Sequence, residues 1–281
     1  MSDAILPFTG ERFTPECVRE IAYEHWHRYA FASTFANGRR VLDAASGEGF
    51  GSALLARTAG SVLGVDIDIT AIEHARARYG AAANLHFEQA DVTVLDHLAD
   101  ASFDLIVSFE TLEHVQAQER LLDGFARLLA PGGLLLLSTP DKRNYSDATG
   151  VVNEHHVREL YREQFEALLA PRFAQRELYA QKLLFQSALW RVDGQGSGES
   201  HCTDDAGELR AGLVYPPMYY LAVCTNRAGC LPELPAISLY GDAAESVYAD
   251  YFAVTREAMA SRETIAELRA QIARLERGDP A

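Results

Sequence analysis

The chain alternates short apolar runs with amphipathic stretches from residue 40 onwards. The apolar runs are too short for core helices and are bounded by turn residues, which predicts buried strands at 40–43, 61–66, 85–88, 103–109 and 134–138. We predict helices at 50–59, 69–80, 117–130 and 158–170, and two further strands at 173–186 and 217–225. Strands and helices that alternate in this way form βαβ units, so we predict an α/β fold with a doubly wound, mostly parallel sheet of seven strands.

This pattern divides the chain into three regions. Residues 1–37 form an N-terminal helical lead, residues 38–235 form the α/β domain, and residues 240–278 form a C-terminal helix. Within the domain, the turn at residues 131–133 (Pro-Gly-Gly) is predicted to stop a helix before the strand at 134. The polar, Gly/Ser-rich stretch 193–200 is predicted to be a mobile loop.

The C-terminal helix carries a heptad seam. Its apolar and small residues alternate steps of four and three, which places Ile265 and Ile272 at a positions and Leu268 and Leu275 at d positions. This pattern favours a parallel two-stranded coiled coil and therefore a homodimer, whereas a single helix laid on the domain has a wider apolar stripe. The seam consists of Val247, Tyr251, Val254, Ala258, Ser261, Ile265, Leu268, Ile272 and Leu275.

The charge, the cysteines and the apolar runs limit which partners and which cellular compartment the protein is expected to have. The 281 residues include 25 Lys and Arg against 40 Asp and Glu, and the net charge of −15 argues against nucleic acid as a partner because phosphate contacts need a basic face. The four cysteines show neither metal-ligand spacing nor a dense disulfide pattern, so we expect reduced thiols and a cytoplasmic location. No apolar run is long enough for a transmembrane segment, which leaves peripheral association as the expected form of any membrane contact.

A glycine-rich loop follows the first predicted strand, and acidic residues follow the next two. Gly47, Gly49 and Gly51 leave bare backbone for a ligand, since glycine removes the Cβ atom from the contact surface. Asp66 closes the second strand, where a carboxylate accepts hydrogen bonds from a ribose diol. Asp91 follows the third strand, where it can accept from an exocyclic amine. These positions predict a nucleoside-containing ligand.

The segment 41–51 resembles the first motif of class I S-adenosylmethionine (SAM)-dependent methyltransferases, with Ala45 where that family often has Cys. The segments 65–66, 90–91 and 103–107 resemble its second, third and fourth motifs in order and at normal spacing. The resemblance implies a Rossmann-like methyltransferase fold with SAM as the methyl donor. A nucleotide-binding dehydrogenase fits less well, because the loop offers GxGxG rather than GxGxxG glycine spacing.

The resemblance also implies roles for individual residues. Gly47 and Gly49 would lie against the amino-acid part of SAM, and Asp66 would hold the ribose hydroxyls. Ile67 would pack on the adenine, and Asp91 would contact its amino group. The other residues expected in the cofactor site are Asp43, Ala45, Val92 and Phe109.

The N-terminal lead resembles the lid that precedes this fold in bacterial methyltransferases of polysaccharide and sugar-pathway gene clusters. The resemblance lies in residues 10–15 and 24–29. Arg28 or Tyr29 would then bind the SAM carboxylate or close over the site, since Arg matches the geometry of a carboxylate. In the alternative interpretation, this helix only packs its aromatic residues on the sheet while Arg28 faces solvent.

Three ligand-type side chains follow the fourth predicted strand. Open α/β sheets bind ligands outside the carboxyl ends of their strands, so Glu110, Glu113 and His114 are expected to face the methyl group of SAM. If residues 111–114 turn helically, the three side chains share one face. Two close carboxylates repel each other unless a proton or a cation lies between them, and a divalent ion would resolve that repulsion.

The loop after the fifth predicted strand adds the adjacent His155 and His156 at the same sheet edge. The ExxEH pattern with a later His before an REQF-type helix resembles the magnesium-dependent 2′-O-methyltransferases of small-RNA 3′ ends and the ubiquinone-pathway O-methyltransferases. This resemblance implies a Mg²⁺ or Mn²⁺ site made of Glu110, Glu113, His114 and His156, in which the metal binds a vicinal diol of the acceptor. A sugar diol would suit the same geometry.

A metal-free interpretation stays open. A Glu-His pair after the fourth strand is common in methyltransferases that bind no metal, where the His serves as a general base or caps the helix. On this interpretation His114, Glu110 and His155 are the catalytic candidates. Two histidines are also less suitable than oxygen ligands for Mg²⁺.

Three functions follow from these patterns. The leading hypothesis is methyl transfer from SAM to a sugar hydroxyl, at the terminus of a surface polysaccharide or on a nucleotide-linked sugar. The second is O- or N-methylation of a small aromatic or quinone metabolite. The third is a SAM-binding scaffold that recruits a partner through its coiled coil.

Overall fold

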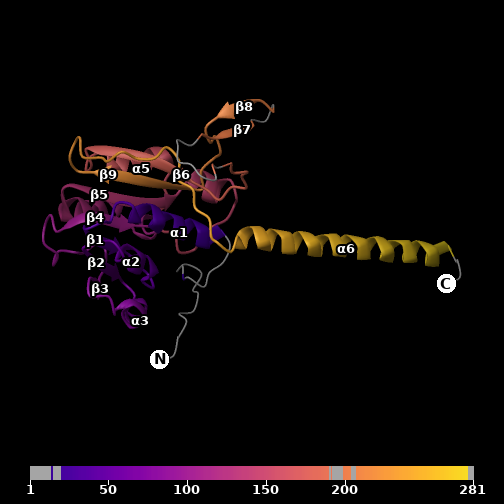
Figure 1. The fold of residues 1–281 in the computed structure, drawn as a ribbon, viewed down its shortest axis with the longest axis horizontal. Coiled ribbons are helices and arrows are strands. Elements are labelled where there is room, and N and C mark those ends of the chain that lie inside the picture. Colours follow the sequence, from indigo (N-terminus) through magenta and orange to yellow (C-terminus); the bar gives the residue numbers. More distant parts are fainter. Residues whose placement is uncertain (1–13, 15–19, 190, 192–198, 204–206, 278–281) are drawn as a thin grey trace.

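The computed structural model describes residue 14 and residues 20–189, 191, 199–203 and 207–277. Two expectations fall largely outside these residues, namely the mobile loop at 193–200 and the lid segment 10–15. The described residues form an α/β domain from which one long helix extends (Figure 1).

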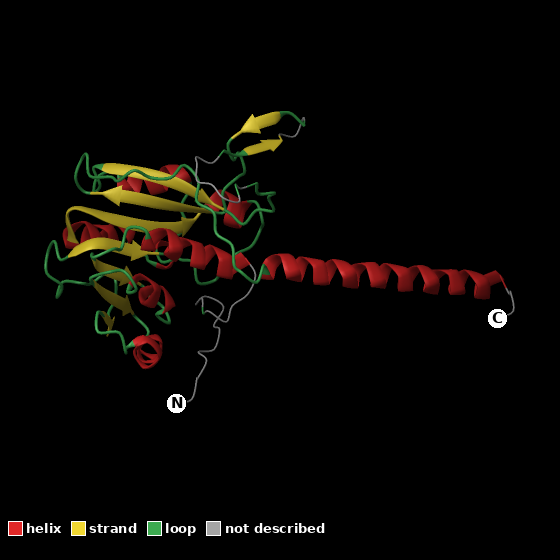
Figure 2. Ribbon diagram, viewed as in Figure 1, coloured by secondary structure: helices red, strands yellow, loops and turns green. Residues whose placement is uncertain are grey.

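Seven strands form one sheet in the order β3-β2-β1-β4-β5-β9-β6 (Figure 2). All neighbouring strands run parallel except β9, which is antiparallel to both β5 and β6. This confirms the predicted seven-stranded, mostly parallel sheet. The strands are β1 (Arg40–Ala44), β2 (Ser61–Asp66), β3 (Leu85–Gln89), β4 (Phe103–Ser108), β5 (Leu129–Pro140), β6 (Gln175–Gln181) and β9 (Tyr219–Thr225).

Helices cover both faces of the sheet, as expected for a doubly wound fold (Figure 2). A small hairpin that the sequence pattern did not predict, β7 (His201–Thr203) with β8 (Leu209–Ala211), lies apart from the main sheet (Figure 1). The helical elements are α1 (Glu20–Ser33), α2 (Phe50–Leu55), α3 (Ile69–Tyr79), η1 (Leu112–His114), α4 (Gln118–Leu128), η2 (Arg143–Asp147), α5 (Arg162–Leu169) and α6 (Ser246–Arg277).

Two apolar cores lie on opposite faces of the sheet, because successive strand residues point to opposite sides. In β5, Leu135 and Leu137 pack against α4 and α5 residues, whereas Leu134 and Leu136 pack with residues of α1, α2 and α3. Tyr29 of α1 belongs to the second core, so the N-terminal helix is part of the domain's packing rather than a detached cover.

The predicted turn at residues 131–133 is wrong. Helix α4 ends at Leu128, and β5 already begins at Leu129, with an irregularity in its pairing with β4 near this point. Gly132 has a φ of 78°, a left-handed value that glycine adopts without strain, and its N–H donates to the Asn226 side chain at 3.0 Å. The Asn226 amide in turn donates to the Leu129 carbonyl at 3.1 Å, so a side chain from beyond β9 satisfies this irregular backbone.

Gly51 has no space for a side chain. A Cβ atom there would lie 2.1 Å from Cζ of Tyr29, so Gly51→Ala should push α1 from the sheet and lower the free energy of unfolding by about 1–3 kcal/mol. Gly124→Ala is the matched control, because a Cβ at this α4 position meets nothing within 4 Å and should raise stability by about 0.5–1 kcal/mol. Urea unfolding measures both, and equal effects of the two substitutions would contradict this packing.

Two sequence expectations concern the chain's environment. In the part of the chain that the structure describes, no helix combines the length and apolarity needed to cross a bilayer. The described cysteines, Cys202, Cys224 and Cys230, form no disulfide.

Candidate active site

Asp43 lies at the end of β1 and is completely buried. Its carboxylate accepts hydrogen bonds from the Tyr29 hydroxyl at 3.0 Å and from the Ser52 hydroxyl at 2.6 Å. Burial raises the pKa of Asp43 to about 7, although both hydrogen bonds favour the charged form. Tyr29 therefore uses its hydroxyl to hold Asp43 and its ring to fill the space above Gly51.

This raised pKa makes stability depend on pH. An unfolded Asp has a pKa of about 3.9, so between that pH and about 7 the folded protein holds more protons than the unfolded chain. The contribution of Asp43 to the free energy of unfolding should thus fall as pH rises from about 4 to 7, by up to about 1.4 kcal/mol per pH unit, and then level off. Between pH 5 and pH 7, the free energy of unfolding measured with urea should change less in Asp43→Asn than in the wild type. An equal change in both proteins would contradict the raised pKa of Asp43.

The loop after β1 presents backbone in an unusual conformation. Ala45 has a φ of 65° and Gly47 a φ of 56°, both in the left-handed region, which is uncommon for a residue with a side chain. Asp66, at the end of β2, accepts from the Gly47 N–H at 2.8 Å and from the Asp68 N–H at 2.9 Å. The carboxylate of Asp66 thus fixes the loop and lies beside its bare backbone.

Gly49 also has a packing role that the sequence did not predict. A Cβ atom at Gly49 would lie 2.8 Å from Cβ of Ala75 and 2.8 Å from the ring of Phe87. The missing side chain makes room for protein atoms, so packing within the domain is sufficient reason for this glycine. Its φ of 94° is a second reason.

The remaining cofactor candidates follow the carboxyl ends of neighbouring strands. Ile67 is 68% exposed, an apolar side chain directly beside Asp66 that protein atoms do not cover. Asp91 accepts from the N–H and hydroxyl of Thr93 through Oδ1. Val92 and Phe109 are buried, and Phe109 packs edge-on against Tyr29 with ring centroids 5.0 Å apart.

Arg28 is buried in the domain and does not face solvent. Only 1% of it is exposed, its Nε donates to Gln181 Oε1 at 2.7 Å, and its guanidinium lies 4.6 Å from the ring centroid of Tyr219. Neither Nη atom has a hydrogen-bond partner, although Nη2 lies 3.4 Å from Glu110 Oε1. Buried guanidinium N–H groups without acceptors are costly, so this position fits an anionic ligand group.

Glu110 follows β4 with a φ of 50°, a strained value for a residue with a side chain. Its N–H donates to Ser138 Oγ at 3.1 Å, and Ser138 Oγ donates back to Glu110 Oε1 at 2.6 Å. The structure therefore directs Glu110 toward Arg28 and β5, and it does not bring Glu110 into the group of candidate metal ligands described next.

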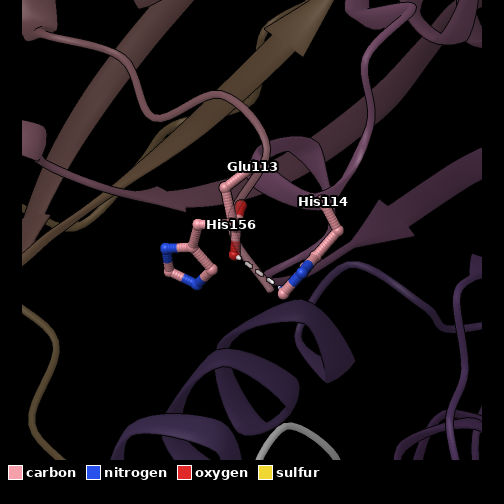
Figure 3. A group of neighbouring side chains, drawn as sticks. All are labelled: Glu113, His114 and His156. Carbon is pink, nitrogen blue, oxygen red and sulfur yellow. Dashed lines mark ion pairs between the residues drawn. The ribbon is translucent and has the colours of Figure 1, made fainter. Parts of the chain in front are cut away.

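Glu113, His114 and His156 form a compact cluster at the carboxyl edge of the sheet. One ligand atom from each residue lies within 4.8 Å of the other two. Figure 3 shows the Glu113 carboxylate between the two imidazole rings, which come from η1 and from the loop before α5. His114 Nε2 lies 3.8 Å from Glu113 Oε1, and the two rings are 4.9 Å apart.

Both histidines are oriented through Nδ1. His114 Nδ1 lies 3.0 Å from the backbone oxygen of His155, and His156 Nδ1 lies 2.6 Å from Glu159 Oε1. Because a carbonyl and a carboxylate accept hydrogen bonds, each Nδ1 carries a proton, and in the neutral imidazole Nε2 is then the nitrogen with the lone pair. A protein acceptor behind the ring is the usual arrangement around metal-binding histidines.

The Glu113 carboxyl group is completely buried, and its charge is only partly compensated. Oε2 accepts from Thr139 Oγ1 at 3.0 Å, whereas Oε1 has no hydrogen-bond partner. Burial raises the pKa of Glu113 well above its usual range, and the charge of Glu110 raises it further. A cation beside Oε1 would satisfy this oxygen and favour the carboxylate.

Backbone hydrogen bonds hold the two halves of the cluster together. The Glu113 carbonyl accepts from the N–H groups of Val157 at 2.8 Å and Arg158 at 3.0 Å. The buried Gln118 amide donates to the carbonyls of Leu112 and Arg158, each at 2.8 Å. These bonds tie residues 157–158 to η1, and α5 begins at Arg162, four residues later than predicted.

The imidazole of His155 lies outside the cluster. Its side chain is 50% exposed and its Nε2 is 3.9 Å from Glu154, so only its backbone oxygen contributes to the site. Sequence reasoning missed the residues that contact the cluster, Glu110 or Arg28, because they act through contacts distant from any motif. They are Glu159, Thr139, Ser138, Gln181, and the two tyrosines Tyr145 and Tyr219, of which Tyr145 stacks on His156 at 5.4 Å.

Comparisons with known proteins show which families this chain resembles. Residues 42–137 match a family described as a methyltransferase domain. A probable SAM-dependent methyltransferase of Mycobacterium tuberculosis is 37% identical over 171 residues, which are 60% of this chain and 61% of that protein. A ubiquinone biosynthesis O-methyltransferase of Paracidovorax citrulli is 30% identical over 122 residues, 43% of this chain and 51% of that protein.

The fold is also shared with solved structures. The YcgJ protein of Bacillus subtilis superposes with a TM-score of 0.52 at 17% identity, covering 73% of this chain and all of that chain. The chain thus has the Rossmann-like methyltransferase fold, and residues 42–137 are similar to a methyltransferase domain. The matched part of this chain spans 61% of the length of the Mycobacterium relative. The activity of the whole protein is therefore proposed below.

Proposed function

We propose that the protein transfers a methyl group from SAM to a hydroxyl of a diol-bearing acceptor, with a divalent metal held by Glu113, His114 and His156. The observation that carries this proposal is the cluster itself: one ligand atom from each of the three residues lies within 4.8 Å of the others, and Glu113 Oε1 has no hydrogen-bond partner. A sugar is the acceptor class that we favour, because vicinal hydroxyls are its common feature.

The residues around the loop after β1 fit SAM. Asp66 lies beside bare backbone where ribose hydroxyls would bind, and the exposed Ile67 supplies an apolar surface for the adenine. Arg28 offers two buried Nη groups to the carboxylate of the methionine part. We therefore assign cofactor binding to these three residues, together with Asp91.

The metal would acidify an acceptor hydroxyl and hold it in place. In the transfer, the acceptor oxygen forms a bond to the methyl carbon as the bond from that carbon to the sulfonium breaks, leaving S-adenosylhomocysteine. Glu110 is the remaining carboxylate beside the cluster, and we assign it to receive the hydroxyl proton, since His114 Nε2 would be a ligand. The Tyr145 ring stacked on His156 limits the orientations that the imidazole can adopt.

The donor set consists of two imidazole nitrogens and one carboxylate oxygen. Mg²⁺ prefers oxygen ligands and retains water, whereas Mn²⁺ accepts a mixed set more readily, so we favour Mn²⁺ of the two. A second candidate function is O-methylation of a small aromatic or quinone metabolite with adjacent hydroxyls. Similarity to the ubiquinone biosynthesis O-methyltransferase supports it.

A methyl-transfer screen with labelled SAM tests the proposal. The acceptors are nucleotide sugars, oligosaccharides and catechols, each assayed in EDTA, in Mg²⁺ and in Mn²⁺. We expect turnover that EDTA abolishes and Mn²⁺ restores, with sugars the better acceptors. Turnover on catechols alone would favour the second candidate, and turnover that is unaffected by EDTA would overturn the metal site.

A further inference from the structure

Helix α6 presents an apolar seam that the rest of the described chain does not cover. The helix extends from the domain as a single rod (Figure 1), and every residue from 256 to 272 is exposed. Ile265, Leu268 and Ile272 are 48%, 51% and 54% exposed, and they recur at alternating steps of three and four. At about 1.5 Å per residue, the 32 residues of α6 extend for roughly 48 Å.

Among the described residues, the domain contacts α6 near the start of this helix, where Phe185 packs on Tyr251 with ring centroids 5.3 Å apart. Within α6, Tyr248 and Phe252 lie edge to face at 4.6 Å. Long helices in water derive most of their stability from packing of an apolar face. The exposed seam beyond these contacts would therefore be stabilised by packing against a partner helix.

The charges beside the seam identify the partner. With Ile265 at an a position, Glu257 occupies a g position and Arg262 the e position five residues later. In a parallel, in-register pair of identical helices, Glu257 of each copy faces Arg262 of the other, giving two attractive contacts by symmetry. The seam thus has the charge complementarity to pair with itself.

An antiparallel pair would be less favourable. Centred on Ile265 and Leu268, it would place Arg262 near Arg269 of the second copy, so that like charges lie together. Isoleucine at the a positions with leucine at d also favours two parallel strands. We propose that α6 pairs with α6 of a second copy as a parallel, in-register coiled coil. This arrangement places the two methyltransferase domains at the same end of the coil.

Charge exchange on the full-length chain tests the partner and the register. Glu257→Arg and Arg262→Glu each place like charges in contact, so each should raise the dimer dissociation constant about tenfold in sedimentation at low salt. The double variant restores the pairs with their charges reversed and should regain wild-type dimerisation. A monomeric wild type, or a double variant as weak as the single ones, would overturn the proposal.

Cross-linking tests the orientation. Cysteines introduced by Ile265→Cys face each other in a parallel, in-register dimer and should form an intermolecular disulfide on mild oxidation. The matched variant Glu263→Cys, on the outer side of the same helix, should not cross-link. Cross-linking of Glu263→Cys but not of Ile265→Cys would overturn the assigned seam. None of these assays measures methyl transfer, so their outcome is independent of the proposed activity.

Discussion

Glu113→Gln and His156→Ala should each lower methyl transfer by at least about 100-fold while leaving SAM affinity within about twofold of the wild type. Glutamine preserves the shape of Glu113 and its contact with Thr139 but loses the charge that attracts a cation. Alanine at position 156 removes a ligand nitrogen and leaves Glu159 without its imidazole partner. Both changes act on the acceptor side of the sheet and not on the loop that fits SAM.

Three measurements make this expectation specific. Mn²⁺ binding, followed by electron paramagnetic resonance, should be lost in both variants. SAM affinity, followed by calorimetry, should be retained. His155→Ala is the matched control, because its half-exposed ring lies outside the cluster while its backbone oxygen still orients His114. A loss of activity in His155→Ala equal to that in His156→Ala would contradict the ligand assignment and favour the earlier assignment of His155 as a catalytic residue.

Asp66→Ala should raise the dissociation constant of SAM by about 100-fold or more. Hydrogen bonds to a charged group contribute about 1.5–3 kcal/mol each, and a ribose diol would form two of them with this carboxylate. The substitution also releases the Gly47 N–H from its acceptor, so the backbone of the loop becomes less well ordered. Isothermal titration with SAM measures the effect directly.

Glu73→Ala is the control for the change in net charge, since Glu73 is an exposed acid on α3. It should leave the SAM dissociation constant within about twofold of the wild-type value. Asp66→Asn should fall between wild type and Asp66→Ala, because an amide can still accept one hydrogen bond through its oxygen. An Asp66→Ala protein that binds SAM as tightly as Glu73→Ala would show that the ribose is held elsewhere.

The strands were predictable because they are buried on both faces. A mostly apolar run such as 103–107, interrupted by Asp104, predicts a strand with little dependence on tertiary context, and β4 begins at Phe103 as expected. The limits of β5 and α5 were less predictable, since each depends on a hydrogen bond from a distant residue. Asn226 stabilises the backbone at Gly132, and the Glu113 carbonyl binds the N–H groups before α5.

The residues of the candidate site likewise divide into those that the sequence predicted and those that only distant contacts placed. Asp66 and the glycine loop were visible in the sequence because strand ends meet at one sheet edge whatever the details of packing. Helical spacing grouped Glu110 with Glu113 and His114, but the left-handed backbone at Glu110 turns that residue toward Arg28. The sequence was equally consistent with an Arg28 side chain that faces solvent. Only the packing of α1 into the core placed this side chain within the domain.

The sequence by itself determined the sheet, the Rossmann-like fold and the strand ends that carry Asp43, Asp66 and Asp91, since local patterns of burial and turns fix these features. Only the tertiary structure decided which side chains form the cluster: it placed His156 with Glu113 and His114, and left Glu110 and the His155 ring outside. The reason is physical: backbone hydrogen bonds join the segment after His156 to Glu113, and Ser138 and a left-handed backbone position Glu110, and no local pattern encodes such contacts.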